Sequence, residues 1–222
     1  MQRPNIDACK LLALGTMLVD HVGVLLMPEA LALRLVGRLA FPLFVCTLGY
    51  NWLHHTADRW AYVRRLLYVA VVAQPAYAWA FDTWRLNILF TLGLGLAAAT
   101  WAAGDRWRII GVMAGAAMVT LIEYLVGGTV TSYGGVGLFA VVCAAFGRWP
   151  LVGFLVALAN LKHLTPAYSV MGMLAALAVA LFAVSVWLPW RPGRWVRNRW
   201  LWYAFYPGHL AALAAVAAFV EG

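Results

Sequence analysis

The sequence predicts an all-α protein: a polytopic transmembrane helical bundle of about nine spans, with a plausible range of roughly eight to ten. Hydrophobic residues make up 65% of the 222 residues, charged residues only 11%, and the mean hydropathy is +0.83. A soluble domain carries about 25% charged residues. Because backbone polar groups in lipid must be satisfied within helices, we expect one integral-membrane domain over residues 1–222 and no soluble domain.

The individual spans are predicted from apolar stretches of roughly 20 residues, the length that crosses a bilayer as a helix. Short loops separate these stretches, so no linker is predicted. Spans six and seven are short and lie on either side of residues 147–150, so they could form a hairpin that does not fully cross. In chain order, the predicted spans are 8–27, 34–53, 61–81, 86–103, 109–127, 134–147, 150–161, 169–188 and 202–220.

The basic residues indicate the orientation of these spans. With the N-terminus in the cytoplasm, 12 of the 16 Lys and Arg residues fall on the cytoplasmic side, and Arg34, Arg38, Arg85 and Lys162 fall outside. This asymmetry is typical of the positive-inside rule. Topology and anionic lipid therefore explain the net charge of +8, and no nucleic-acid partner is expected.

The first span contains an acid and a histidine, Asp20 and His21, deep within its apolar stretch. An Asp at the centre of a lipid-spanning helix costs roughly 2.5–3.5 kcal/mol on insertion scales, so such residues usually face a protein interior or a wet cavity. We interpret the pair as part of a reaction site or a proton path. A buried polar pair that joins helices is the alternative.

Other polar residues fall at a similar depth. His21 follows Asp7 by 14 residues, which places it about 20 Å from the cytoplasmic end. The same reasoning puts Arg38, Asn87 and Glu123 in the outer half of the bundle, and a polar cavity that opens outward is expected. Tyr206 and His209 of the last span are expected beneath it.

Each of these residues also has a structural explanation. Arg38 could extend to the outer interface, Asn87 could cap a helix, and Glu123 could be protonated and bonded to a backbone carbonyl. His209, after Pro207, could hydrogen-bond backbone groups that a break in the helix leaves without partners. On the first span, residues Asp7, Lys10, Leu14, Met17 and His21 form one stripe at helical spacing.

Several site classes are not supported. The three cysteines are scattered among apolar residues, which fits neither a disulfide framework nor metal spacing. His54 and His55 have no further ligands nearby, so no metal site is expected. Nucleotide-binding loops and hydrolase or zinc-protease motifs do not occur.

Five ordered motifs resemble the TraX family of membrane proteins: MLVDHVG, RLVGRLAFPLFVCTLGYNWLHHT, YVRRLLYVAVVAQPAY, LNILFTLGLG and YAFYPGHL. They cover residues 5–95 and 203–215. The family's founding member is associated with N-terminal acetylation of F-type conjugative pilin. The resemblance therefore implies a multi-pass protein of the bacterial cytoplasmic (inner) membrane that transfers an acetyl group from cytoplasmic acetyl-CoA to the N-terminus of a membrane-inserted pilin.

TraX is in turn distantly similar to membrane acyltransferase family 3. That family often begins with Arg, Asp, a basic residue and a His, which Arg3, Asp7, Lys10 and His21 match. Arg64-Arg65 and the ending from Tyr206 to His209 match loosely. The chain departs from the family's serine-glycine-phenylalanine signature, where it has Leu48-Gly49-Tyr50.

For such a transfer, histidine is the natural base at neutral pH. We expect His21 as the base, Asp20 or Glu123 as its electrostatic support, and Arg38 or Asn87 as the donor to the oxyanion. Asn87, Glu123, Tyr206 and His209 are the candidate substrate-binding residues. Candidates for binding CoA are Lys10, Arg64, Arg65, Arg106 and Arg108.

Three other functions stay open at this stage. The acceptor could be a cell-surface glycan or lipid that is O-acetylated. Intramembrane Asp20, His21, Arg38 and Glu123 could instead form a proton-coupled transporter, although no inverted repeat is visible. The last alternative is a non-enzymatic assembly factor for pilin, which would bind no acetyl-CoA.

Overall fold

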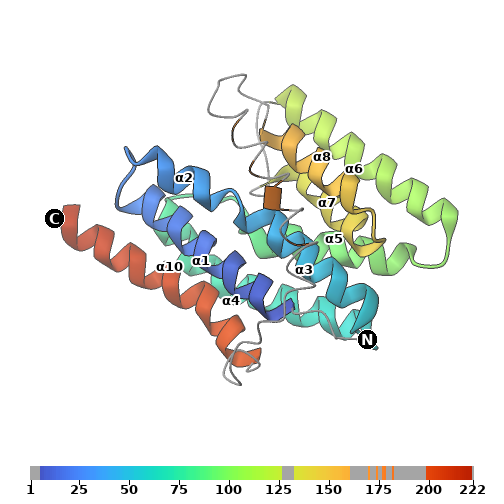
Figure 1. Cartoon of the computed structure of the whole chain (residues 1–222), viewed down its shortest axis with the longest axis horizontal. Coiled ribbons are helices and arrows are strands. Elements are labelled where there is room, and N and C mark those ends of the chain that lie inside the picture. The colour runs from blue at the N-terminus through green and yellow to red at the C-terminus, as the bar shows by residue number, and fades with distance from the viewer. Residues whose placement is uncertain are drawn as a thin grey trace.

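The computed structural model describes residues 6–126, 133–160 and 199–221, together with positions 170, 174, 177, 178 and 182. Within this part of the chain, all regular structure is helical and no strand occurs, as the composition predicts. Helix α10 runs along one edge of the molecule beside α1 and α4, and α6 runs along the opposite edge beside α7 (Figure 1). Helices α3, α5 and α7 pack together between these edges.

The observed helices follow the predicted spans to within a few residues at most boundaries. They are α1 (Ile6–Leu25), α2 (Leu31–Gly37), α3 (Ala40–His54), α4 (Arg59–Phe81), α5 (Ile88–Ala102), α6 (Arg106–Val126), α7 (Gly134–Ala145), α8 (Trp149–Asn160) and α10 (Arg199–Glu221). The predicted span 169–188 lies almost entirely outside the described residues. So do the predicted loop residues Arg3, Lys162, Arg191, Arg194 and Arg197.

The predicted span 34–53 is present but not continuous, because it divides into α2 and α3 at Arg38 and Leu39. Pro42, in the first turn of α3, has no N–H to donate to the carbonyl of Arg38, and its ring crowds that carbonyl. The chain passes the break with bonds between residues three apart, from Arg38 N to Leu35 O and from Leu39 N to Val36 O. Pro42 thus places Arg38 at a helix end.

Side-chain caps explain where α4 and α6 begin. Each of these helices follows a loop that the sequence places on the cytoplasmic side. The Asp58 carboxylate accepts a hydrogen bond from Ala61 N at 2.8 Å and begins α4. The Asp105 carboxylate accepts from Trp107 N at 2.8 Å and begins α6. Such caps satisfy amide groups that have no partner inside the helix.

The core lies where α3, α5 and α7 meet. Leu43 and Val45 of α3, Leu96 of α5 and Val141 of α7 are fully or almost fully buried there. Gly49 of α3 allows the close approach of α7, since a Cβ at this position would lie 2.6 Å from the carbonyl carbon of Ala144. Close contact through small residues is the usual basis of helix association in a bilayer.

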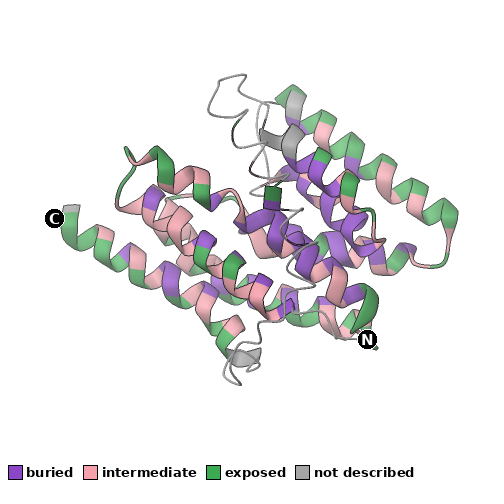
Figure 2. Cartoon of the chain, viewed as in Figure 1, coloured by how far each residue is buried: buried purple, intermediate pink, exposed green. Residues whose placement is uncertain are grey.

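Large apolar side chains cover the outer faces of the bundle. Phe219 of α10 is 87% exposed, and α6 exposes Trp107, Leu125 and Val126, on the faces drawn as exposed in Figure 2. Three segments of the described chain, fewer than the nine predicted spans, are long and apolar enough to cross a membrane: Ile6–Leu25, Leu31–His54 and Leu201–Val220. Ile88–Ala102 and Gly134–Ala145 are shorter apolar helices.

Candidate functional site

Two neighbouring cavities lie among α1, α3, α4, α5 and α10. The first, named here the Lys10 cavity, has a volume of about 240 Å³, and the second, the His21 cavity, has a volume of about 230 Å³. Met17, Phe44, Ile88 and Tyr206 line both cavities. These four side chains therefore form the constriction at which the two spaces meet.

Helix α1 supplies one wall along both cavities. Lys10, Leu14 and Met17 line the Lys10 cavity, and Met17, Asp20 and His21 line the His21 cavity. Four of these residues belong to the stripe expected from helical spacing. Lys10 and His21 are 11 residues apart, which corresponds to about 16 Å along the helix axis. The two cavities thus extend along α1 between a cation and an imidazole.

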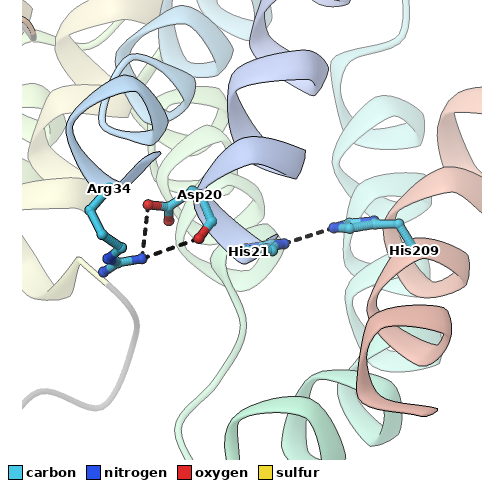
Figure 3. Close-up of polar contacts among 4 residues, drawn as sticks. All are labelled: Asp20, His21, Arg34 and His209. Carbon is cyan, nitrogen blue, oxygen red and sulfur yellow. Dashed lines mark hydrogen bonds and ion pairs between the residues drawn. The ribbon is translucent and has the colours of Figure 1, made fainter. Parts of the chain in front are cut away.

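His21 is paired with His209, which α10 brings against α1. The Nδ1 atom of His21 lies 2.7 Å from Nε2 of His209, and the planes of the two rings are parallel to within 3° (Figure 3). Phe81 packs edge-on against His21, and Phe205 stacks on His209. The partner of His21 is therefore an imidazole, where the sequence suggested the carboxylate of Asp20 or Glu123.

A backbone contact defines the protons of this pair. His209 Nδ1 lies 2.7 Å from the carbonyl oxygen of Phe205, which can only accept a hydrogen bond. With both rings neutral, His209 Nδ1 carries the proton and its Nε2 accepts from His21 Nδ1. His21 Nε2 then has a lone pair and no proton. The geometry leaves His21 as an oriented base with its free nitrogen away from His209.

Asp20 forms an ion pair with Arg34 across the hairpin between α1 and α2. The distance from Arg34 Nη1 to Asp20 Oδ1 is 2.8 Å, and the same nitrogen lies 3.5 Å from the Asp20 carbonyl oxygen (Figure 3). Gly37 lies against the Asp20 side chain, so that a Cβ at position 37 would collide with it. This ion pair lines the His21 cavity.

Sequence reasoning missed Arg34, which it assigned only to the outer loop. The signal was nevertheless present. Asp20 is five residues before the end of α1, and Arg34 is three residues after the start of α2, so an antiparallel hairpin brings the two to the same level. An acid and a base in equivalent places on either side of a tight helical hairpin are expected to pair.

Arg38 also lines the His21 cavity, together with Asp20 and His21. Its side chain hydrogen-bonds the hydroxyl of Tyr133, the residue that precedes α7. The lining of this cavity therefore includes two guanidinium groups and one carboxylate. The structure brings the three expected catalytic residues to one cavity.

Asn87 and Glu123 serve other contacts and line neither of the two cavities. The Asn87 side chain caps α5 through Leu89 N at 3.0 Å and donates to Ala70 O and Gln74 Oε1, each at 2.8 Å. The Glu123 carboxylate accepts from Gly135 N at 2.7 Å at the start of α7. Both residues join helices. The five polar residues expected at one depth (Asp20, His21, Arg38, Asn87 and Glu123) therefore do not form one site.

The basic residues expected to bind CoA are also divided. Lys10 lines its cavity, pairs with Asp7 at 2.9 Å and faces the Trp202 ring. Arg64 and Arg65 are exposed on α4, and Arg65 is close to Tyr62, which lines the Lys10 cavity.

Arg106 and Arg108 begin α6, which packs against α5 and α7. Both are exposed and line neither cavity. Arg108 pairs with Asp105 at 3.3 Å and lies over the Trp101 ring. The structure thus associates Lys10 and Arg65 with the cavity and separates Arg106 and Arg108 from it.

Among the described residues, no cluster of three or more His, Cys, Asp or Glu side chains could hold a metal ion. Cys9, Cys46 and Cys143 are buried, and no disulfide joins them. The rings of His54 and His55 lie beside Tyr50. The polar groups of the candidate site are therefore mainly the imidazoles and guanidinium groups in the cavity walls.

Comparison with known proteins agrees with the motifs. The model of the family described as TraX protein matches residues 5–217. Protein TraX of Escherichia coli strain K12 is 31% identical over 220 residues, covering 95% of this chain and 86% of that protein. A second Protein TraX of Escherichia coli is 29% identical over the same shares.

A shorter match covers part of the chain. The probable fimbrial assembly protein FimC, serogroup H1, of Dichelobacter nodosus is 35% identical over 114 residues, which is 42% of this chain and 46% of that protein. No solved structure matches. Because the family model spans almost all of its sequence, this chain belongs to the TraX family.

Proposed function

We propose that this protein is a membrane-embedded acetyltransferase that moves an acetyl group from cytoplasmic acetyl-CoA to the N-terminus of a conjugative pilin. Membership of the TraX family supports a role in pilin modification, and the name of the FimC relative refers to fimbrial assembly. The observation that carries the proposal is the His21–His209 pair, which leaves a histidine lone pair at a buried cavity.

The topology that goes with this function has about nine spans in the inner membrane and a cytoplasmic N-terminus. The Lys10 cavity then lies toward the cytoplasm, and the His21 cavity lies toward the outer side. The exposed apolar faces of α6 and α10 support contact with lipid. A cytoplasmic donor and an acceptor presented from the membrane would approach His21 from opposite directions.

The reaction needs a base that removes one proton. The acceptor amine attacks the carbonyl carbon of the thioester, a carbon–nitrogen bond forms, and the carbon–sulfur bond breaks. His21 Nε2 takes the proton from the amine and returns it to the leaving thiolate, which departs as the thiol of CoA. His209 keeps the His21 ring in the required tautomer throughout, in the manner of the third member of a hydrolase triad.

The cations near His21 have a separate role. As the amine attacks, negative charge develops on the thioester oxygen, and a preorganised donor lowers the barrier. Arg38 in the wall of the His21 cavity can supply that donor. Asp20, held by Arg34, balances part of the positive charge and supports the imidazolium that forms for a short time.

The arm of CoA is proposed to enter through the Lys10 cavity and to reach His21 past the shared constriction. Its nucleotide phosphates would stay at the cytoplasmic surface, near Lys10, Arg64 and Arg65. Guanidinium groups bind phosphates well because their donors form a planar fork.

The decisive experiment uses the whole protein in lipid nanodiscs with isotope-labelled acetyl-CoA. The acceptor is a synthetic peptide with the pilin N-terminus, and the same peptide with a blocked N-terminus is the control. We expect mass spectrometry to find one labelled acetyl group on the free N-terminus alone. Failure to bind acetyl-CoA would contradict the proposal, while binding with label transferred only to glycan or lipid would contradict the pilin acceptor.

A further inference from the structure

We propose that Thr47 forms a subsite in the Lys10 cavity that hydrogen-bonds an amide group of the donor's pantetheine arm. This inference rests on the donor proposed above, and it goes further by assigning a binding role to a residue outside the reaction centre. The occupant is of one chemical class: a thin, uncharged chain that carries amides along its length.

The first observation is an unsatisfied hydroxyl group. Thr47 is only 3% exposed, lines the Lys10 cavity, and its Oγ1 forms no hydrogen bond to any described residue. A buried hydroxyl without a partner costs about 1–3 kcal/mol. Since a threonine in a helix can usually satisfy its hydroxyl with a carbonyl one turn earlier, this one stands out as available to an occupant of the cavity.

The second observation is the arrangement of the cavity walls. Helix α3 faces the cavity with Phe44, Thr47, Leu48 and Asn51, which follow helical spacing. Thr47 and Asn51 thus provide hydroxyl and amide groups on an otherwise apolar strip. Such a strip fits a chain in which short apolar stretches alternate with amides.

The third observation concerns charge. Of the residues that line the Lys10 cavity, Lys10 alone carries a formal charge, and it lies near the N-terminal end of α1. An anionic group therefore fits beside Lys10, and the rest of the cavity favours an uncharged segment. This division matches a ligand with phosphates at one end and a neutral arm.

A second buried hydroxyl belongs to Tyr206, which lines both cavities. The Tyr206 side chain is buried in the shared constriction, and its hydroxyl approaches the Ile88 amide without hydrogen-bonding geometry. Thr47 on α3 and Tyr206 on α10 thus supply two hydroxyls in the walls of one path. An arm with two amides would meet polar groups at more than one point before its sulfur reaches the His21 cavity.

The chain offers a matched control for Thr47. Thr91 of α5 is fully buried and its hydroxyl also forms no hydrogen bond, but it lines neither cavity. Val is close to Thr in size and lacks the hydroxyl, so T47V and T91V remove the same group from the two places. An effect of folding alone would appear in both variants.

The test measures binding of CoA and of adenosine 3′,5′-bisphosphate, which lacks the pantetheine arm, by calorimetry in nanodiscs. T47V is expected to bind CoA about 3- to 10-fold more weakly than the parent, as the loss of one hydrogen bond implies. T91V is expected to equal the parent, and the armless nucleotide should not distinguish any of the three proteins. Equal CoA binding by T47V and the parent, or equal weakening in T47V and T91V, would overturn the subsite.

A ligand-side measurement applies even if T47V fails to fold. The parent protein is given S-acetylpantetheine and an S-acetyl alkyl thioester of the same length without amides. We expect the amide-bearing thioester to bind at least about 3-fold more tightly, and equal binding, as for a simple lipid-chain cavity, would contradict the inference. If the parent binds CoA but does not discriminate these arms, only the subsite fails; if it binds no CoA at all, the proposed donor fails as well.

Discussion

His21 and His209 are 188 positions apart in the chain, yet their ring planes are parallel to within 3° and a 2.7 Å hydrogen bond joins them. The carbonyl of Phe205 fixes the direction of that bond, because it requires the proton of His209 Nδ1. The first and last helices thus define together the protonation of a single ring. This relationship connects the distant ends of the sequence to the reaction that we propose.

The His21→Ala variant should lose acetyl transfer by about 100-fold or more, since a positioned general base contributes roughly 10²–10⁴ in rate. The measurement is the initial rate of peptide acetylation by purified protein. His54→Ala is the control, because His54 is exposed at the end of α3. A His21→Ala rate within twofold of the parent would rule out His21 as the base.

Substitutions at His209 should act through the tautomer of His21. His209→Phe keeps a ring but removes the acceptor, and kcat should fall about 10-fold or more with little change in the KM for acetyl-CoA. His209→Gln retains a side-chain acceptor and should recover part of the rate. If Phe and Gln variants have equal kcat, the hydrogen bond to His21 is not what matters at this position.

Asp20 and Arg34 should show a strong energetic coupling. Arg34→Gln or Asp20→Asn alone leaves one charge of a half-buried pair, with an expected loss of about 1–3 kcal/mol in unfolding free energy. The double variant should be more stable than the sum of the single losses implies. Thermal unfolding of the four proteins in one detergent measures the coupling, and strictly additive losses would contradict the ion pair.

Arg38→Ala should lower kcat by about 10²–10³, the usual effect of removing one oxyanion donor. Arg85→Ala is its control, because Arg85 is an exposed arginine of the loop before α5. Arg38→Lys should have an intermediate rate, since it keeps the charge without the planar fork. Binding of acetyl-CoA, measured separately, should be unchanged; a loss confined to binding would assign Arg38 to the donor instead.

Asn87→Ala should lower stability and leave the chemistry intact. Its side chain joins α4 to α5 through Ala70 and Gln74, and loss of these bonds should cost about 1–3 kcal/mol, or several degrees in Tm. The rate per folded molecule should equal that of the parent. A reduced kcat at an unchanged Tm would instead support the prediction that Asn87 binds substrate.

Much of the described fold follows from the sequence because long apolar stretches favour helices, which satisfy their own backbone polar groups. The bounds of α4, α5 and α7 lie within two residues of the predicted ones. The break between α2 and α3 depends instead on one residue, Pro42, whose effect on the preceding turn is local and does not appear in average hydropathy.

The depth of the site residues in the bundle could be predicted from the sequence, but the residues with which they pair could not. Helix rise placed Asp20, His21 and Arg38 at one level, and they line one cavity. Rotation about each helix axis is set by packing, so it was not evident that His209 would face His21 or that Glu123 would face Gly135. Residues at equal depth can point to different neighbours, which is why Asn87 and Glu123 line neither cavity.

The helix break that Pro42 imposes also changes the local electric field around the His21 cavity. Each helix has a macrodipole whose negative pole lies at its C-terminus, and α2 ends at Gly37, just before Arg38. Arg34 is in the last turn of α2 and Arg38 is its cap, so both arginines belong to the end of the helix that carries the negative pole. A continuous helix would carry this pole to its far end; here the broken segment stabilises positive charge beside His21 by about 0.3–1 kcal/mol per group, without a second carboxylate.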